Sequence, residues 1–183
     1  MRQGPEPGRM ILDAEAVNRA LRRIAHEIVE RNRGVEGVIL LGIARRGEPL
    51  AARLGRLLTD IEHPSQPVPV YSLDIGPYRD DREATERPGL PFSSDNRVVV
   101  IVDDVIWTGR SVRAAMDAVT AAGRARRIEV AVLVDRGHRE LPIRPDFVGK
   151  NIPTAHDEYV HVNLAELDGG ADAVLVLRGG SRA

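Results

Sequence analysis

One short stretch holds the side chains whose types and spacing point most directly to chemistry. Residues 98–111 read Val-Val-Val-Ile-Val-Asp-Asp-Val-Ile-Trp-Thr-Gly-Arg-Ser. The β-branched run is typical of a buried strand, two adjacent acids stand where that strand is expected to end, and a Thr-Gly-Arg-Ser turn leads into a helical pattern. Turn amides and a helix N-terminus attract phosphate, while carboxylates hold sugar hydroxyls or a hydrated Mg²⁺. The stretch therefore predicts a site for a sugar phosphate.

The predicted nucleotide site consists of the two acids and the turn that follows them. Its members are Asp103, Asp104, Val105, Ile106, Trp107, Thr108, Gly109, Arg110 and Ser111. The alternative reading is that the acids are only solvated, or cap a turn. Two other phosphate-binding motifs are excluded, because the chain has no Gly-x-x-x-x-Gly-Lys-Ser/Thr loop and no Gly-x-Gly-x-x-Gly after its first strand.

The composition predicts one globular domain. The chain has 183 residues, is 43% hydrophobic and contains no Cys, which excludes disulfides and suits a reducing cytoplasm. Residues 1–10 are polar, so we expect a disordered lead rather than a signal peptide, then a single domain over 11–183. No apolar run is long enough to cross a membrane.

The net charge of −1 means that any nucleic-acid site has to be a local patch. The bias toward Arg (Lys150 is the only Lys) suits phosphate contacts, although genomic composition explains it as well.

The hydrophobic pattern predicts strands that alternate with helices. Helices are expected over 13–33, 47–58 and 111–122, and strands over 38–43, 68–75, 98–102, 128–134, 159–164 and 173–177. Asp13 is a plausible N-cap of the first helix, and Gly34 ends it. Residues 76–96 lose periodicity and read as a lid, and residues 135–158 read as mostly irregular. This order predicts an α/β fold with a doubly wound, mostly parallel sheet.

The carboxyl ends of parallel strands meet at one edge, where such folds bind ligands. Three segments follow strands in this chain and are expected at that rim: residues 42–47, 103–111 and 135–137. The rim is therefore the expected place of the reaction.

Several segments carry a resemblance to a known family. Residues 98–111 resemble the phosphoribosyl pyrophosphate (PRPP) signature of type I phosphoribosyltransferases, which many enzymes share. More narrowly, the chain resembles the PyrR family of pyrimidine operon attenuation regulators, which are also uracil phosphoribosyltransferases. This second match uses residues 22–27, 78–81, 112–118, 133–144 and 149–154. The run from 134 to 154 is much more specific than the general signature.

The resemblance implies a type I phosphoribosyltransferase fold that converts uracil and PRPP into UMP and pyrophosphate with Mg²⁺. Asp103 and Asp104 would hold the ribose hydroxyls, or the Mg²⁺ that PRPP brings, and residues 108–111 the 5′-phosphate. It further implies a pyrophosphate loop, a flap over 76–96 and a base-binding hood at about 135–160. The matching residues are Arg45, Arg46 and Gly47 for the loop, Arg79 and Asp80 for the flap, and Asp135, Arg136 and Val160 for uracil.

Three positions qualify this reading. Trp107 stands where purine-type relatives carry an acid, which argues against a purine and leaves the group that deprotonates uracil unassigned. Arg45 replaces a small hydroxyl residue common in the family. Without the resemblance, Arg136 would be read as an ordinary surface Arg after a strand.

The first helix gives a hint about RNA. Its apolar stripe is Val17, Leu21, Ile24 and Ile28, and at 100° per residue His26 falls almost opposite, among several Arg. The alternative is a solvated helix face. The resemblance implies instead a basic surface that binds a stem-loop of pyrimidine operon mRNA when UMP is bound. Its members would be Arg22, Arg23, His26, Arg45, His138, Arg139, Arg144 and Lys150. An aromatic content of 3% argues against a sheet platform that stacks bases.

Two rival functions stay open at this point. One is a phosphoribosyltransferase without RNA function, and the other is a non-catalytic, nucleotide-sensing RNA binder. The resemblance also implies a cytoplasmic homo-oligomer, a dimer or a hexamer, with no membrane partner.

Overall fold

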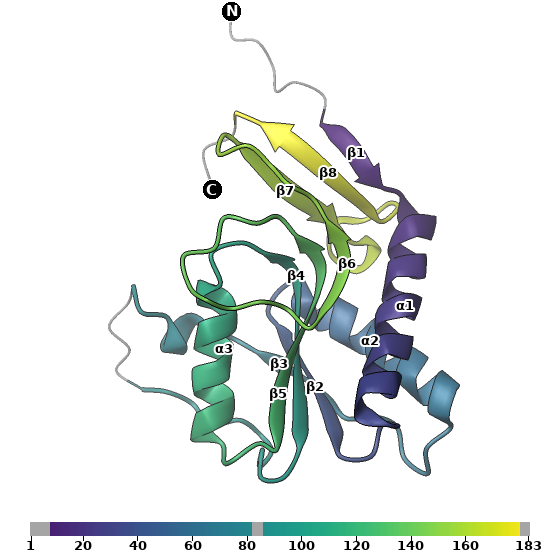
Figure 1. Ribbon diagram of the computed structural model, residues 1–183, viewed down its shortest axis with the longest axis vertical. Helices are drawn as coiled ribbons and strands as arrows, with labels where there is room; N and C mark the ends of the chain where they lie inside the picture. Colours follow the sequence, from purple (N-terminus) through teal and green to yellow (C-terminus); the bar gives the residue numbers. More distant parts are fainter. Residues whose placement is uncertain (1–7, 82–85, 180–183) are drawn as a thin grey trace, which may run out of the picture.

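Two sheets form the framework of the protein, which is described by a computed structural model covering residues 8–81 and 86–179 (Figure 1). A five-stranded parallel sheet has the order β3-β2-β4-β5-β6, and a three-stranded antiparallel sheet has the order β1-β8-β7. The strands are β1 (Arg9–Leu12), β2 (Val38–Ile43), β3 (Val70–Leu73), β4 (Val98–Ile106), β5 (Arg127–Asp135), β6 (Phe147–Asn151), β7 (Glu158–Asn163) and β8 (Ala173–Arg178). The helices are α1 (Ala14–Asn32), α2 (Gly47–Glu62), the 3₁₀ turn η1 (Gly76–Tyr78), α3 (Arg110–Ala121) and α4 (Ala165–Asp168).

Helices cover both faces of the parallel sheet (Figure 1). In β4, Val98, Val100 and Val102 pack into the cluster formed with α1 and α2. Val99 and Ile101 pack on the other face, into the cluster formed with α3. This alternation is what a strand buried on both faces requires. The predicted doubly wound parallel sheet is confirmed.

Helix α1 follows its sequence signals closely. The Asp13 side chain accepts a hydrogen bond of 2.8 Å from the Ala16 N–H, as an N-cap does. At the other end, Arg33 adopts the left-handed conformation with φ 57°, and its N–H bonds back into the last turn. The predicted stripe is buried: Val17, Leu21, Ile24 and Ile28 are each at most 2% exposed.

Strand lengths differ from the prediction in the middle of the fold. Strand β4 continues to Ile106, so the two acids lie within the strand and not after it. Helix α2 continues to Glu62, and β3 is shorter than expected. The segment 135–158, predicted as mostly irregular, contains β6, which pairs with β5 from Ala131↔Phe147 onward. Parallel pairing with β5, the preceding strand, supplies the stabilisation that the short β6 sequence does not signal.

We call the three-stranded β1-β8-β7 sheet the hood; of its residues, only 158–160 fall in the region of about 135–160 that was predicted as a base-binding hood. Arg9 pairs with Val176 and Tyr159 pairs with Leu177, so segments from both halves of the chain contribute to the sheet. Arg9 and Met10 were predicted to be part of a disordered lead, and this is wrong; residues 1–7 lie outside the described residues. Hood residues Val162, Leu164 and Val174 share one core with α1 and the parallel sheet. Within the described part of the chain, no helix is long and apolar enough to span a bilayer.

The start of α2 is pressed against β4 at Gly47. A Cβ atom added to Gly47 would lie 2.2 Å from the carbonyl oxygen of Val102 and 3.3 Å from the Cα of Asp103. Only a residue without a side chain fits there, so the Arg46–Gly47 corner sits in direct contact with the strand that carries the acids.

We expect Gly47→Ala to lower the free energy of unfolding by about 1–3 kcal/mol, because overpacking forces the backbone apart. Helix propensity alone would raise that free energy by up to about 1 kcal/mol, so the sign is diagnostic. Urea unfolding followed by circular dichroism measures it. Gly89→Ala is the matched control, since a Cβ there meets nothing within 4 Å. A stabilised Gly47→Ala variant would contradict the close approach.

Candidate functional site

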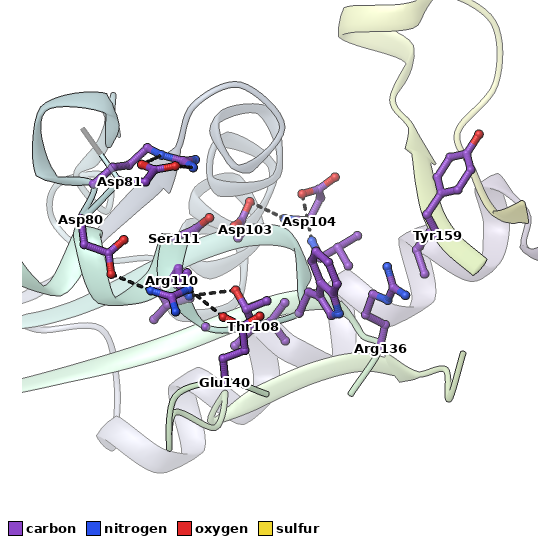
Figure 2. Close-up of a pocket in the computed structure, with 17 residues that line it drawn as sticks. Asp80, Asp81, Asp103, Asp104, Thr108, Arg110, Ser111, Arg136, Glu140 and Tyr159 are labelled. Carbon is purple, nitrogen blue, oxygen red and sulfur yellow. Dashed lines mark hydrogen bonds and ion pairs between the residues drawn. The ribbon is translucent and has the colours of Figure 1, made fainter. Parts of the chain in front are cut away.

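Two adjoining cavities lie at the carboxyl end of the parallel sheet. The first, of about 620 Å³, is lined by the whole segment 103–112 together with Arg79, Asp80, Asp81, Arg136, Glu140, Tyr159 and Val160 (Figure 2). The second, of about 540 Å³, is lined by Ala44, Arg45, Arg46, Asp74 and their neighbours. Asp103, Asp104 and Ser111 line both. The three segments predicted to meet at this rim do so, and the cavities have the size of ligand pockets.

The two acids are desolvated carboxylates in these cavities. Asp103 is only 9% exposed, and Asp104 is half-buried. Burial raises the pKa of Asp103 well above its usual range, and the neighbouring Asp104 charge adds to this. Burial also raises the pKa of Asp104, while a hydrogen bond from Asp103 and the charge of Arg46 oppose the shift. A cationic or hydroxyl-bearing ligand would relieve this cost by replacing the lost hydration.

The turn after β4 lines the first cavity. Gly109 adopts the left-handed conformation with φ 92° and begins α3. The Arg110 N–H bonds to the Thr108 hydroxyl at 3.3 Å, and the Thr108 carbonyl accepts 3.1 Å hydrogen bonds from the backbone of Glu140 and Leu141. A turn fixed in this way, at a helix N-terminus, is suited to an anion such as phosphate.

The flap reaches this turn through Asp80. The Arg110 guanidinium donates to Asp80 at 2.7 Å and to Glu140 at 2.8 Å, and Arg113 lies 3.6 Å from the same Asp80. The flap is anchored behind by Tyr78, which is 1% exposed. Flap residues 82–85 lie outside the described residues. Asp80 and Arg79 of the predicted flap thus line the first cavity together with the turn at residues 108–111, which we call the phosphate turn.

Arg136 is not an ordinary surface Arg. It is 6% exposed, and it donates to the Thr154 hydroxyl at 3.0 Å and to the Glu158 carbonyl at 2.6 Å. Its guanidinium lies 4.9 Å from the centroid of the Trp107 ring, a cation–π contact. Arg136 therefore ties β7 to the wall of the first cavity and contacts the Trp107 ring there.

The other two predicted uracil residues lie in different places. Val160 lines the first cavity beside Tyr159. The Asp135 carboxylate lines a smaller cavity of about 390 Å³ with Arg144 and Asn151 instead. It accepts hydrogen bonds from the Gly137 N–H at 2.9 Å and from Arg139 at 2.6 Å. Its side chain therefore orders the 135–144 segment.

Four residues of the first cavity were not predicted: Asp81, Val112, Glu140 and Tyr159. Glu140 lies in the specific run 134–154, and Tyr159 precedes Val160 in β7, so their positions were noted without their roles. Only the fold shows that Glu140 and Tyr159 both line the first cavity.

The basic residues predicted to bind RNA divide into two groups. Arg22, His26, Arg144 and Lys150 are exposed, and we call these four the basic face. They lie on α1 and on or beside β6, which are neighbours because Arg23 donates to the Val148 and Gly149 carbonyls at 3.0 and 2.6 Å. Arg45 is exposed too, but lies on the second cavity.

Arg139 and His138 have internal contacts instead. Arg139 donates to the Trp107 carbonyl at 2.8 Å and to the Ile143 carbonyl at 2.9 Å, and its side chain is 19% exposed. His138 Nε2 lies 2.7 Å from the Thr154 carbonyl oxygen. These two residues hold the 135–154 segment against the cavity, so substituting them would disturb the cavity as well as any outer surface.

The raised pKa of Asp103 leads to a testable prediction about stability. Because the folded pKa of Asp103 is raised, the folded protein binds its proton more tightly than the unfolded chain does. Stability is then greatest below the ordinary pKa of 3.8 and falls as the pH rises through the raised value. We expect Asp103→Asn to raise the midpoint of thermal unfolding at pH 7, with a gain that shrinks toward pH 4. Calorimetry between pH 4 and 8 measures this, and an equal or lower midpoint at pH 7 would contradict it.

Comparisons with known proteins agree with this geometry. The family model described as a phosphoribosyl transferase domain matches residues 8–167. The bifunctional protein PyrR of Roseiflexus sp. (strain RS-1) is 53% identical over 176 residues, which cover 93% of this chain and 95% of that protein. The bifunctional protein PyrR of Pelotomaculum thermopropionicum is 52% identical over 172 residues, covering 91% and 94%.

Solved structures share the fold. A hypoxanthine phosphoribosyltransferase from Staphylococcus aureus matches with a TM-score of 0.71 and 18% identity, over 93% of this chain and 91% of that one. One from Trypanosoma cruzi, in complex with the product IMP, matches with a TM-score of 0.70 and 18% identity, over 97% and 94%. The predicted fold and family are both confirmed. The chain belongs to the phosphoribosyl transferase domain family and, within it, to the bifunctional PyrR proteins.

Proposed function

We propose that this protein transfers the ribose 5-phosphate of PRPP to uracil, giving UMP and pyrophosphate, and that it binds a stem-loop of pyrimidine operon mRNA in response to UMP. One observation carries the proposal: the two acids and the phosphate turn lie between two cavities, in a chain 53% identical to a bifunctional PyrR protein. A non-catalytic nucleotide sensor, and a transferase without RNA function, are the rivals that the experiments below separate.

The shared wall of the two cavities supports an assignment of substrate parts. Asp103, Asp104 and Ser111 belong to both cavities, so the ribose fits at the junction. The base then lies in the first cavity beside Trp107 and Val160, and pyrophosphate in the second beside the Arg45–Gly47 loop. This order puts the bond from ribose C1 to pyrophosphate at the junction, where it has to break.

The charges at the junction suit that bond cleavage. Positive charge develops on the ribose as the bond lengthens, and the carboxylates of Asp103 and Asp104 lie beside it. Negative charge develops on the leaving pyrophosphate, which faces Arg45 and Arg46. Fixed charges that match the charge of a transition state are usually the largest single contribution to catalysis. Flap residues Arg79 and Asp80 would cover the junction and exclude water.

Mg²⁺ fits these residues as a companion of the substrate. Carboxylate oxygens are the ligands it prefers, and it commonly uses one or two of them together with substrate phosphates and water. Among residues 8–81 and 86–179, no group of three or more His, Cys, Asp or Glu side chains could hold a metal by itself. Asp103 and Asp104 would hold the ion together with PRPP. When bound, it would neutralise charge on the pyrophosphate.

The base pocket favours a small planar ring. The Trp107 ring is contacted by the Arg136 guanidinium, and the Trp107 carbonyl is held by Arg139. Val160 and Tyr159 provide the opposite wall. An aromatic side chain occupies the position that an acid takes in purine-type relatives, which favours uracil over a purine.

The basic face supports the RNA half of the proposal. RNA loops are bound by stacking and hydrogen bonding, for which Arg and His are suited, and phosphate contacts add affinity. UMP in the cavities would favour the RNA-binding state, and linkage requires RNA to tighten UMP binding by the same factor. An mRNA partner implies that the protein acts in the cytoplasm, and we propose that it does so as a homo-oligomer.

The enzymatic half predicts that the folded protein forms UMP from uracil and PRPP in the presence of Mg²⁺. Asp103→Asn combined with Asp104→Asn should lower turnover by about 10²-fold or more, because the charge beside the developing cation is lost. UMP formation followed by chromatography measures both. A wild type that forms no UMP would support the non-catalytic rival, and equal turnover by the variant would refute the ribose assignment.

The RNA half predicts that His26→Ala combined with Lys150→Ala weakens stem-loop binding about 10²-fold, at roughly tenfold per lost contact, and spares turnover. Arg139 is left intact because it holds the Trp107 carbonyl. Gel shifts at physiological salt, with and without UMP, measure this. Arg126→Ala is the control, because Arg126 is exposed just before β5, at the amino end of that strand, and Lys150 lies near the carboxyl end of β6. Absence of a UMP-dependent shift by the wild type would favour the transferase without RNA function.

A further inference from the structure

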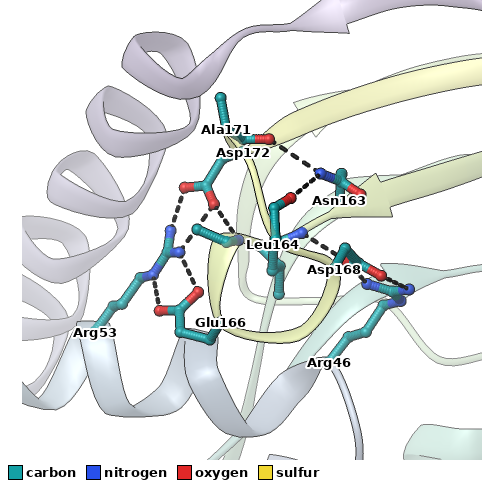
Figure 3. Close-up of polar contacts among 10 residues, drawn as sticks. Arg46, Arg53, Asn163, Leu164, Glu166, Asp168, Ala171 and Asp172 are labelled. Atoms are coloured by element: carbon teal, nitrogen blue, oxygen red, sulfur yellow. Dashed lines mark hydrogen bonds and ion pairs between the residues drawn. The ribbon is translucent and has the colours of Figure 1, made fainter.

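An acidic turn in the hood faces the pyrophosphate end of the site. Residues 163–172 connect β7 to β8 and include α4; we call them the acidic turn. Their three carboxylates meet two arginines: Asp168 meets Arg46, which immediately precedes α2, and Glu166 and Asp172 meet Arg53, within α2 (Figure 3). Arg46 and Arg53 are seven residues apart, about two helical turns, so they lie on the same side of the helix and its N-terminal cap. None of these carboxylates lines either cavity.

The acidic turn is held in place by several contacts that do not involve Asp168. Arg53 donates to Glu166 at 2.8 Å and to Asp172 at 2.9 Å, with further contacts between the same groups. Asp172 also accepts a 2.9 Å hydrogen bond from the Ala165 N–H, and its side chain is only 7% exposed. Asn163 donates to the Ala171 carbonyl at 3.0 Å. The turn is thereby fixed to α2 independently of Arg46.

Asp168 connects the acidic turn to Arg46 through hydrogen bonds. Its carboxylate accepts a 2.9 Å hydrogen bond from the Leu164 N–H and receives both terminal nitrogens of Arg46, at 2.6 and 3.0 Å. The Arg46 guanidinium and the Leu164 N–H hold the pKa of Asp168 well below its usual range. The carboxylate is therefore charged and fixed at neutral pH.

Arg46 keeps donors for a second anion while it is held. A guanidinium has five N–H bonds, and the paired contact with Asp168 uses one on each terminal nitrogen. The Nε–H and two terminal N–H bonds lie outside that contact. Arg46 lines the second cavity together with Asp103 and Asp104, and its backbone is fixed by the neighbouring Gly47. A planar guanidinium can bridge two anions through different edges.

We propose that Asp168 is a positioning residue: it holds the Arg46 guanidinium at the second cavity so that the group is already oriented when the pyrophosphate part of PRPP arrives. The inference rests on the proposed function, which places pyrophosphate in that cavity. An arginine without this partner would sample several rotamers, and binding would have to stop that motion. The hood thus acts on the leaving-group end of the site without touching the substrate.

The test compares Asp168→Asn with Glu166→Gln. Asp168→Asn keeps the shape of the side chain but loses the charge that orients Arg46. We expect magnesium pyrophosphate to bind about tenfold more weakly by titration calorimetry, and the KM for PRPP to rise by a similar factor. The KM for uracil should change less than twofold, a split that general loss of structure would not produce.

Glu166→Gln removes a carboxylate from the same turn. In the described structure Glu166 pairs with Arg53 and not with Arg46. It should leave pyrophosphate binding and both KM values within twofold of the wild type. Asp168→Glu, which keeps the charge and moves it by one methylene, should fall between wild type and Asp168→Asn. Thermal unfolding of every variant verifies the fold.

The outcomes separate this inference from the function on which it rests. A wild type that binds no pyrophosphate would overturn both. A wild type that binds it, with Asp168→Asn equally tight, would overturn only the positioning role. Tighter binding by Asp168→Asn would also overturn it, since it would show that Asp168 competes with pyrophosphate for Arg46.

Discussion

The whole site depends on placing two adjacent carboxylates inside a strand that is buried on both faces. Side chains of the apolar part of β4 alternate, with Val102 toward α1 and α2 and Ile101 toward α3. Beyond the acids Val105 packs on the α1–α2 core and Ile106 packs beside Val112 of α3, so the alternation shifts across Asp103 and Asp104. Burying such groups costs stability, because charge is removed from water. The sheet tolerates that cost because the rest of β4 is an unbroken apolar run. Both acids line both cavities, so a ligand in either cavity meets them.

Much of the fold follows from the sequence, because strong local signals and tertiary packing agree. The run 38–43 is apolar throughout and became β2 with the predicted bounds. The Asp13 cap and the buried stripe of α1 are equally local. The elements that could not be predicted depend on strand pairing that their own sequences do not indicate. Strand β1 has four residues and β6 is Phe-Val-Gly-Lys-Asn, so neither has a clear period, and each is defined by pairing with β8 or β5.

The same division holds for the site. The acids and the phosphate turn are contiguous, so residue types at fixed spacing identified them. The roles of Arg136 and Arg139 required the fold, since a sequence shows a positive charge but not the carbonyl that it meets. Arg139 joins Trp107 to Asp135 and so links the wall of the base pocket to the segment that continues toward Arg144. A shift of Trp107 would reach that outer segment through one side chain.

The construction of the hood has a consequence for synthesis. Its middle strand, β8, pairs with β1 near the start of the chain and follows the acidic turn, which orients Arg46. While residues beyond 157 are still inside the ribosome, the nascent chain contains the acids and the phosphate turn, but neither β1 nor Arg46 has its partner. Emergence of the last strand brings these pieces together in one step. The segment 158–178, rather than the central sheet, thus supplies the partners of β1 and Arg46.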